Sequence, residues 1–385
     1  MCALKIEPLL SENIEELAGQ SLSVCYQCGT CTAACPLGVH VRKLVRQMQL
    51  GAKEDAVSDN TLWSCATCKL CELRCPRGVN ITDLLHALRI LGFQGRKAPA
   101  KLEQALWGVY EEGNPWKGKK LERGKWAEGL GLKVVGNTSD RPSKVLLYAG
   151  CAVSYDPRLQ NVARSLAEIL KDNADVAILG EKESCCGDVV YQIGEDAYFE
   201  ELVQNNIKTF KDSGADTLIT VSPHCFNMFK TVYPNYGSMP NVVHYTEFLS
   251  NLLDKDALKL NGGNSSGEKT VTTYHDPCYL GRYYGIYEEP RKILESIPNI
   301  ELTEMSDTKE NALCCGGGGG QMWTDHDGAS PSHERVVQAS ETKASVMATS
   351  CPYCIQNFED ATKTKGLELK VMDVSEILNQ SLKKK

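Results

Sequence analysis

The sequence predicts an α+β protein of several domains, in which a helical N-terminal domain precedes a duplicated α/β unit. Its length of 385 residues is sufficient for two or three domains, each with its own core. Residues 1–95 contain two copies of one cysteine pattern, and apolar residues at helical spacing follow each copy. In residues 143–385 apolar β-runs alternate with helical segments, twice over, and this order is typical of parallel sheets.

The composition and charge exclude several classes of protein. Apolar residues make up 42% and charged residues 24%, as in ordinary globular proteins. The net charge is −7, with no long basic run apart from the tail 383–385, so we expect no nucleic-acid partner. No apolar stretch approaches the roughly 18 residues of a membrane helix, and the first residues lack the basic-then-apolar order of a signal peptide. We therefore expect a cytoplasmic protein, or one held at the inner face of a membrane by a partner.

The 18 cysteines are the most informative residues. The cytoplasm keeps thiols reduced, and many of these cysteines stand two or three residues apart, so metal clusters are a better prediction than disulfides. Two N-terminal runs share the form C-x2-C-x2-C-x3-C-P. Their cysteines are Cys25, Cys28, Cys31 and Cys35 in the first run, and Cys65, Cys68, Cys71 and Cys75 in the second.

This form is the bacterial ferredoxin pattern for a [4Fe–4S] cluster, and in two-cluster ferredoxins the fourth Cys of one run ligates the other cluster. We therefore predict two cubane clusters that pass one electron at a time. The predicted ligand sets are Cys25, Cys28, Cys31 and Cys75 for one cluster, and Cys65, Cys68, Cys71 and Cys35 for the other. Zinc fits less well, because structural zinc sites usually draw two ligand pairs that are roughly a dozen or more residues apart.

The remainder of this region predicts helices and a linker. Apolar residues recur at steps of three and four over 41–48 and 81–91, so each segment has one apolar face. We expect a helical, ferredoxin-like domain over residues 1–95, in which the clusters form much of the core. Residues 96–142 are rich in Lys, Gly and Trp and predict a linker with a helix over 102–111. Three tryptophans are expected to be packing groups: Trp107, Trp116 and Trp126.

Matching cysteines define the second duplication. Three cysteines of the first copy recur in the second at nearly constant shifts of 127, 129 and 126 residues. The pairs are Cys151 with Cys278, Cys185 with Cys314, and Cys225 with Cys351. Chance does not account for this agreement, and it places the copies at 143–262 and 268–385, joined by the flexible segment 261–267. Both copies have cysteines at the ends of β-runs, where parallel sheets carry their sites.

Each copy also contains a Cys-Cys-Gly sequence, at 185–187 and at 314–316. Two adjacent cysteines cannot both take ordinary corners of a cubane without unusual backbone. The glycine that follows relieves this strain and lets amides approach the sulfides. The glycine-rich run 316–320 lacks the Lys-Ser/Thr ending of a phosphate-binding loop, so it predicts no nucleotide site.

The second copy, with its Cys-Cys-Gly between a single Cys and a Cys-x2-Cys pair, resembles the cysteine-rich domain of heterodisulfide reductases. The N-terminal runs are similar to the small ferredoxin-like subunit of the same enzyme. Their combination resembles the fused form of that enzyme, in which the ferredoxin-like and cysteine-rich subunits are one chain, over nearly all 385 residues. The resemblance implies a noncubane [4Fe–4S] cluster that cleaves a disulfide. Its catalytic ligands would be Cys278, Cys314, Cys315, Cys351 and Cys354.

The first copy departs from this pattern, because Met228 occupies the position of the fifth cysteine. The four remaining thiols suit an ordinary [4Fe–4S] cluster, a zinc ion or a degenerate structural site, and we favour the iron–sulfur cluster. They are Cys151, Cys185, Cys186 and Cys225. With these assignments Cys2 is left free.

Polar residues near the cysteines have two candidate roles each. His275 and Asp276 would donate protons to a leaving thiolate, or hydrogen-bond a metal ligand, and His224 has the same alternatives. Arg282 and Arg291 would hold an anionic substrate or partner, or pair at the surface. Of these residues we assign only His275 to the catalytic group.

Two functions fit an iron–sulfur oxidoreductase of this type. In the first, electrons pass through the two cubanes to the noncubane cluster, which reduces or forms a disulfide of a small thiol substrate. In the second, the chain has no substrate and relays electrons between a flavoprotein or dehydrogenase and a membrane quinone, a cytochrome subunit or another reductase; the loss of the fifth cysteine favours this alternative. No G-x-G-x-x-G follows a strand, so electrons must come from a separate chain, and both functions need a partner subunit.

Overall fold

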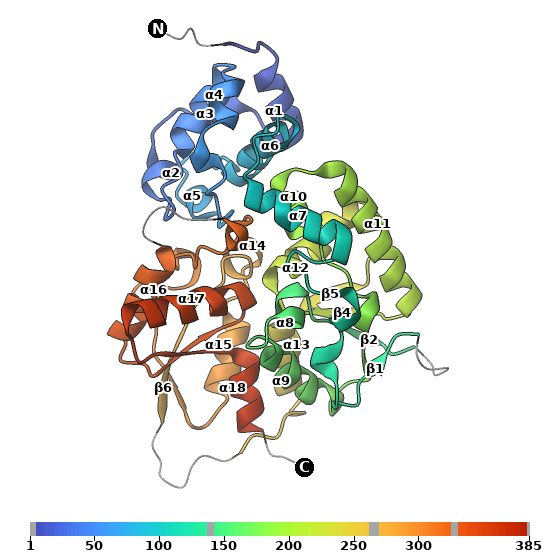
Figure 1. The fold of residues 1–385 in the computed structure, drawn as a ribbon. Helices are drawn as coiled ribbons and strands as arrows, with labels where there is room; N and C mark the ends of the chain where they lie inside the picture. The colour runs from blue at the N-terminus through green and yellow to red at the C-terminus, as the bar shows by residue number, and fades with distance from the viewer. Residues whose placement is uncertain (1–4, 137–141, 262–268, 325–329, 383–385) are drawn as a thin grey trace.

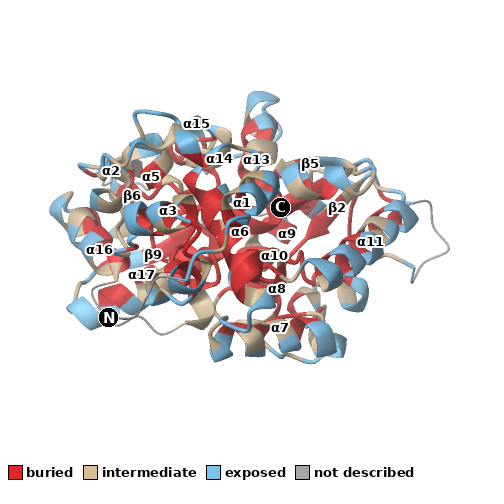
Figure 2. Cartoon of the chain, turned by 90° about the horizontal axis from the view of Figure 1, so that it is seen from above, coloured by how far each residue is buried: buried red, intermediate tan, exposed pale blue. Residues whose placement is uncertain are grey.

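The computed structural model describes residues 5–136, 142–261, 269–324 and 330–382 (Figure 1). Three bodies meet at the centre of the molecule: a helical N-terminal domain, a first α/β repeat and a second α/β repeat. Buried residues concentrate in this central region (Figure 2). Cys2 and nearly all of the predicted flexible segment 261–267 lie outside the described residues. Within the described residues, no helix has the length and apolar character needed to cross a membrane.

The N-terminal domain is helical, as predicted. Its helices are α1 (Leu10–Ala18), α2 (Thr30–Ala33), α3 (Val41–Gln49), α4 (Lys53–Val57), α5 (Leu70–Leu73) and α6 (Ile81–Gln94). The two helices expected from apolar spacing are α3 and α6. On α3 the four apolar residues are buried and most of the intervening residues face outward. By contrast, α6 is buried on nearly every side, because it lies against α1 and α4 of its own domain and against the first repeat.

The predicted linker contains the expected helix, α7 (Ala100–Glu112). Its last part is not a linker, because β1 (Lys133–Val134) pairs with the sheet of the first repeat. Trp126 is buried and Trp116 packs against Trp323, as expected for packing groups. Trp107 is 58% exposed and packs edge-on against Tyr110 of the same helix, so it contributes a surface contact rather than a core contact.

The first repeat is a parallel five-stranded sheet in the order β1-β3-β2-β4-β5. Its further elements are β2 (Val145–Tyr148), α8 (Cys151–Tyr155), α9 (Gln160–Lys171), β3 (Val176–Ile178), α10 (Asp188–Ile193), α11 (Asp196–Ser213), β4 (Thr217–Thr220), α12 (Pro223–Asn227), β5 (Asn241–His244) and α13 (Tyr245–Asp254). A π-helical turn over Met228–Val232 follows α12 directly.

The second repeat is a separate parallel sheet of four strands in the order β7-β6-β8-β9. Its elements are β6 (Thr270–Tyr274), α14 (Gly281–Tyr284), α15 (Glu288–Glu295), β7 (Ile300–Leu302), α16 (Pro331–Glu341), β8 (Val346–Thr349), α17 (Pro352–Lys365), β9 (Lys370–Asp373) and α18 (Val374–Ser381). The two sheets share one strand order, since β6, β7, β8 and β9 correspond to β2, β3, β4 and β5. Cysteines follow the two central strands of each sheet, so each set gathers at the carboxyl edge of its sheet.

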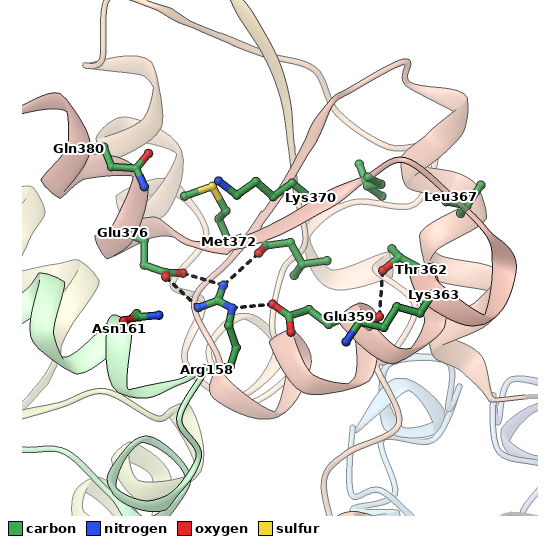
Figure 3. A pocket seen from close by; sticks show the side chains of 12 residues that line it. Arg158, Asn161, Glu359, Thr362, Lys363, Leu367, Lys370, Met372, Glu376 and Gln380 are labelled. Atoms are coloured by element: carbon green, nitrogen blue, oxygen red, sulfur yellow. Dashed lines mark hydrogen bonds and ion pairs between the residues drawn. The ribbon is translucent and has the colours of Figure 1, made fainter. Parts of the chain in front are cut away.

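The two repeats pack against each other through a shared core. Apolar residues of α9, α13, α15 and α18 belong to one continuous cluster of buried side chains. Arg158, which precedes α9, reaches the second repeat and pairs with Glu359 at 2.6 Å and with Glu376 at 2.8 Å (Figure 3). The same guanidinium donates to the carbonyl oxygen of Val371 at 3.1 Å. This network fixes the first repeat against α17, α18 and β9.

We expect Arg158→Met to lower the free energy of unfolding by about 2 kcal/mol, because it removes charged hydrogen bonds and leaves two carboxylates without their cation. The measurement is the thermal midpoint of the holoprotein, which should fall by a few degrees. Lys208→Met is the control, since the exposed Lys208–Asp212 pair on α11 contributes only about 0.3–0.5 kcal/mol. Equal shifts in the two variants would contradict the bridging role.

Candidate iron–sulfur sites

The four cysteines predicted for the first cubane line one cavity beside α2. They are Cys25, Cys28, Cys31 and Cys75. Cys28 is exposed and the other three are half-buried. The Thr30 hydroxyl, 3.4 Å from the sulfur of Cys28, lowers the pKa of that thiol. The fourth cysteine thus comes from the second run, which is the crossed arrangement of the ferredoxin pattern; ligation by this set stays a prediction.

The four cysteines predicted for the second cubane lie deeper in the molecule. They are Cys35, which is half-buried, and Cys65, Cys68 and Cys71, which are buried. Burial raises the pKa of Cys65 to about 12, and the neighbouring thiols Cys35 and Cys68 contribute to the increase. Because the thiolate is the form that binds iron, a cluster at this site would supply the positive charge that a buried thiolate needs.

Arg89 on α6 ties this site to both repeats. The side chain is completely buried, and its guanidinium makes no ion pair with a carboxylate of the described chain. It donates hydrogen bonds to carbonyl oxygens of all three bodies. The acceptors are Leu62, Trp63 and Cys65 of the N-terminal domain, Gln192 of the first repeat and Gly319 of the second. Burial lowers the pKa of Arg89, but a guanidinium keeps its proton in proteins, so a fixed positive charge lies beside Cys65.

The second repeat packs directly on the loop that carries Cys65. A Cβ atom at Gly318 would lie 2.4 Å from the carbonyl oxygen of Ala66, and one at Gly319 would lie 2.2 Å from that of Cys65. Only glycine admits two backbones at this distance. No role beyond the Cys-Cys-Gly turn was predicted for the glycine-rich run, and the structure shows that the run makes this close approach.

Polar side chains of the second repeat hold the same loop. Tyr283 donates to the carbonyl oxygen of Thr67 at 2.7 Å, and Arg282 donates to that of Cys68 at 2.5 Å. Arg282 is therefore built into an internal contact and forms no ion pair with a carboxylate of the described chain. Its predicted role in holding an anion stays a prediction. Arg291 is also internal, since it pairs with Asp276 at 2.6 Å.

These contacts join two of the predicted cluster sites. The thiol of Cys68 contacts the thiol of Cys314 in the second repeat, and this contact, with burial, raises the pKa of Cys68 well above its usual value. The two residues share a small buried cluster with Cys278. The second cubane site therefore abuts the second repeat without intervening protein.

All five cysteines predicted for the noncubane site are buried and adjacent. They are Cys278, Cys314, Cys315, Cys351 and Cys354. The sulfur atoms of Cys315 and Cys354 are 3.2 Å apart. The amide of Gly316 donates to the sulfur of Cys314 at 3.3 Å. The gathering of these thiols agrees with the predicted set, and their ligation of a cluster stays a prediction.

The first repeat gathers its four cysteines around a cavity at the inter-repeat boundary. They are Cys151, Cys185, Cys186 and Cys225. Met228 is fully buried and does not line that cavity. Arg123, from the predicted linker, donates to the sulfur of Cys151 at 3.3 Å and pairs with Glu183 at 2.9 Å. Arg123 is not among the predicted site residues, because nothing in the local pattern of the linker indicates which buried site it enters.

His224 links the first repeat to the second. Its Nδ1 lies 3.3 Å from a carboxylate oxygen of Asp188, and its ring packs on Tyr279 with the centroids 4.1 Å apart. Burial disfavours the charged imidazole, but Asp188 and the thiol of Cys351 outweigh it and raise the pKa of His224 to about 10. Burial likewise raises the pKa of Cys351, but hydrogen bonds from Cys354 and His224 outweigh it and lower that pKa to about 6. His224 therefore faces a cysteine of the opposite repeat rather than its sequence neighbour.

His275 is held as a neutral imidazole. Its Nδ1 accepts a hydrogen bond from Arg335 at 3.1 Å, and burial and the charge of Arg335 lower its pKa well below the usual value. The proton therefore resides on Nε2, which has no partner among the described residues. Asp276 is engaged by Arg291, so its predicted role as a proton donor has no support. The catalytic assignment of His275 stays a prediction.

The unpartnered donors fit an anionic group beside the second-repeat cysteines. Buried nitrogens without a partner in the described chain include Nε2 of His275, Nη2 of Arg282 and Nη2 of Arg335. Buried donors left unpaired cost free energy, and sulfides and thiolates of a cluster are acceptors that would pair them. No three or more described His, Cys, Asp or Glu side chains are arranged for a single metal ion. The iron–sulfur cluster favoured for the first repeat stays a prediction.

Comparison with known protein families agrees with this arrangement. Residues 24–79 match the 4Fe-4S dicluster domain, and residues 145–230 and 272–359 each match the cysteine-rich domain. The predicted dicluster domain and the predicted cysteine-rich duplication are thereby confirmed.

The names of three relatives describe an iron–sulfur-binding oxidoreductase, a quinone oxidoreductase and a heterodisulfide reductase. The probable iron-sulfur-binding oxidoreductase FadF of Bacillus subtilis is 35% identical over 74% of this chain and 41% of its own length. The EtfAB:quinone oxidoreductase of Syntrophomonas wolfei is 32% identical over 73% of this chain and 40% of its own. One subunit of the dihydromethanophenazine:CoB–CoM heterodisulfide reductase of Methanosarcina acetivorans is 34% identical over 62% of this chain and 59% of its own.

The chain thus spans 40–59% of the length of these three relatives. The similarity to a heterodisulfide reductase is confirmed, over a smaller part of the chain than the nearly complete resemblance predicted. Among solved structures, a putative Asp/Glu racemase from Yersinia pestis aligns at 12% identity over 61% of this chain and 96% of its own, with a TM-score of 0.29. That score is too low to indicate a shared fold.

The crossed ligand sets predict how iron is lost from paired variants. Cys28→Ala with Cys75→Ala removes two ligands from one cluster, so about four iron atoms per chain should be lost. Cys28→Ala with Cys35→Ala damages both clusters, so about eight should be lost. Iron analysis of anaerobically purified protein makes the comparison, with wild type as the reference. The opposite result, a loss of about eight iron atoms in the Cys28/Cys75 variant and about four in the Cys28/Cys35 variant, would mean that each run holds its own cluster.

The close approach of backbones at Gly319 predicts that a side chain added there lowers the stability of the protein. Gly319→Ala should lower the free energy of unfolding by about 2 kcal/mol more than Gly366→Ala, because the added Cβ overlaps the Cys65 carbonyl oxygen. Gly366 is the matched control, since it has a similar positive φ and nothing within 4 Å of its Cβ position. Thermal unfolding of the two holoproteins measures the difference. Indistinguishable midpoints would refute the close packing of the glycine-rich run.

Proposed function

We propose that this chain, an iron–sulfur oxidoreductase with a 4Fe-4S dicluster domain and two cysteine-rich domains, conveys electrons from a partner subunit to a disulfide-active site in the second repeat. The observation that supports it is the contact between Cys68 and Cys314, which joins the second cubane site to five gathered cysteines. Electron exchange requires such closeness, and Arg89 and Gly319 maintain it.

The bound clusters would supply one-electron transfer at the N-terminal sites and disulfide chemistry at the second repeat. Reduction of a disulfide consumes two electrons and two protons and yields two thiols. The chain's own contribution is to gather the thiols and exclude water from them. His275 offers an N–H at Nε2, and Arg282 and Arg335 provide positive charge where thiolates collect.

An electron-transfer subunit without a substrate of its own is the second candidate. The five second-repeat cysteines are each at most 7% exposed, which leaves little surface for a substrate, and the first repeat lacks the fifth cysteine. The relative named EtfAB:quinone oxidoreductase supports a protein partner and a quinone acceptor. In this case a partner at the inner face of a membrane would receive the electrons.

The two candidates differ in the EPR spectrum of the oxidised protein with and without an added thiol. We expect a thiol-dependent signal in wild type, at about 12 to 16 iron atoms per chain, and its loss in Cys315→Ala. Cys186→Ala is the matched control, because it removes the corresponding cysteine of the first repeat. About eight iron atoms and no thiol-dependent signal would leave the electron-transfer subunit as the function.

A further inference from the structure

A cationic groove lies beside the exposed cubane site of the N-terminal domain. Residues 24–79 contain seven Lys and Arg against four Asp and Glu, a net charge of +3 within a chain of −7. The groove has a volume of about 970 Å³ and follows α3. It shares Gln27, Gly29 and Arg42 with the cavity of the first cysteine set. Its lining contains four basic side chains and no carboxylate: His40, Arg42, Lys43 and Arg46.

Two of these charges are not neutralised within the described chain. Lys43 pairs with Asp59 at 2.8 Å, but neither Arg42 nor Arg46 pairs with a described carboxylate. Arg46 contacts the amide oxygen of Gln49 at 3.4 Å, and both arginines are exposed. The side chain of Arg42 extends over Gly29, in the cysteine loop itself. The positive charge therefore reaches the edge of the cavity that Cys28 opens to solvent.

An exposed aromatic side chain lies at the same place. Tyr26 is 59% exposed, and it lines the cavity of the first cysteine set together with Arg77. Interfaces of transient electron-transfer complexes are small, and aromatic residues are enriched at the cores of protein interfaces. Charged rims steer such partners together and set the salt dependence of association.

We propose that this face, formed by Tyr26, Arg42, Arg46 and Arg77, is the docking site of an acidic redox protein that delivers single electrons to the first cubane site. The inference rests on the proposed electron-carrying function and adds the entry surface and the charge of the partner. One electron leaves the partner, which is oxidised, and reduces this chain by one electron; no bond forms or breaks and no proton moves. Opposite charge accelerates encounter, and salt weakens the effect by screening.

The test is stopped-flow reduction of the iron-loaded protein by a pre-reduced acidic 2[4Fe–4S] ferredoxin, used as the probe. The variant Arg42→Glu with Arg46→Glu should lower the second-order rate constant about tenfold or more. Raising the salt concentration should lower the wild-type rate and leave the variant less affected. The control is Lys363→Glu with Lys365→Glu, an identical charge change on exposed residues of α17, and its rate should stay close to wild type.

Two further measurements distinguish a failure of the docking site from a failure of the electron-carrying function. Dithionite should reduce the clusters of all three proteins to the same extent; wild-type protein that takes up no electrons would remove the electron-carrying function and the docking site with it. Full reduction by dithionite with equal ferredoxin rates in groove and control variants would overturn the docking site alone. Loss of binding to phosphatidylglycerol vesicles in the groove variant, with an unchanged ferredoxin rate, would assign the groove to a lipid surface and also overturn it.

Discussion

The rest of the structure depends on one buried contact, in which the loop of Cys65 and Cys68 packs against the second repeat. Loops are ordinarily surface features with freedom to move, yet two predicted redox sites meet at this one. Arg89 removes that freedom by binding carbonyl oxygens of all three bodies, and Gly318 and Gly319 allow the backbones to approach. An uncharged or shorter side chain at 89 would leave several buried carbonyl groups unpaired, so the contact requires a long, multivalent donor.

The two repeats share one scaffold and differ in their cysteines. Their sheets have the same strand order, and each gathers cysteines at its carboxyl edge. They diverge after the last cysteine that both contain. In the second repeat α17 begins at Pro352 and carries Cys354, whereas in the first repeat a π-helical turn begins at Met228. The first repeat nevertheless contributes a side chain to the cysteine site of the second repeat, because His224 hydrogen-bonds to Cys351 across the boundary. The repeat that lacks the fifth cysteine thus forms part of the wall of the complete site, which illustrates how fold and site chemistry separate.

Buried thiols and buried arginines occur together throughout the molecule. Burial raises the pKa of most of the deep cysteines, so their thiolates need positive charge from a cluster or from the protein. Each deep set has such a group. Arg89 lies beside Cys65 of the second cubane set, and Arg123 donates to Cys151 of the first repeat. Arg282 lies near both Cys68 of the second cubane set and Cys314 of the second repeat. Around the exposed first set, the solvent-facing Arg42 and Arg77 line the cavity instead. Because metal binding and folding are coupled in such sites, iron loading is expected to determine stability as well as function.

The sequence by itself determined the local chemistry. The spacing of the cysteines predicted the crossed ligand sets and the duplication, and the spacing of apolar residues predicted helices over 41–48 and 81–91. A further helix over 102–111 was predicted in the linker. Only the tertiary structure decided which sites touch. The bond from Arg89 to Gly319 spans 230 positions, and those from Arg123 to Cys151 and from His224 to Cys351 likewise join separate elements. It also placed Arg282 against the loop of Cys68, 214 positions away, which no local pattern indicates. Periodicity and spacing record what one helix or turn requires, whereas the partners of a buried polar group are set by the packing of whole domains.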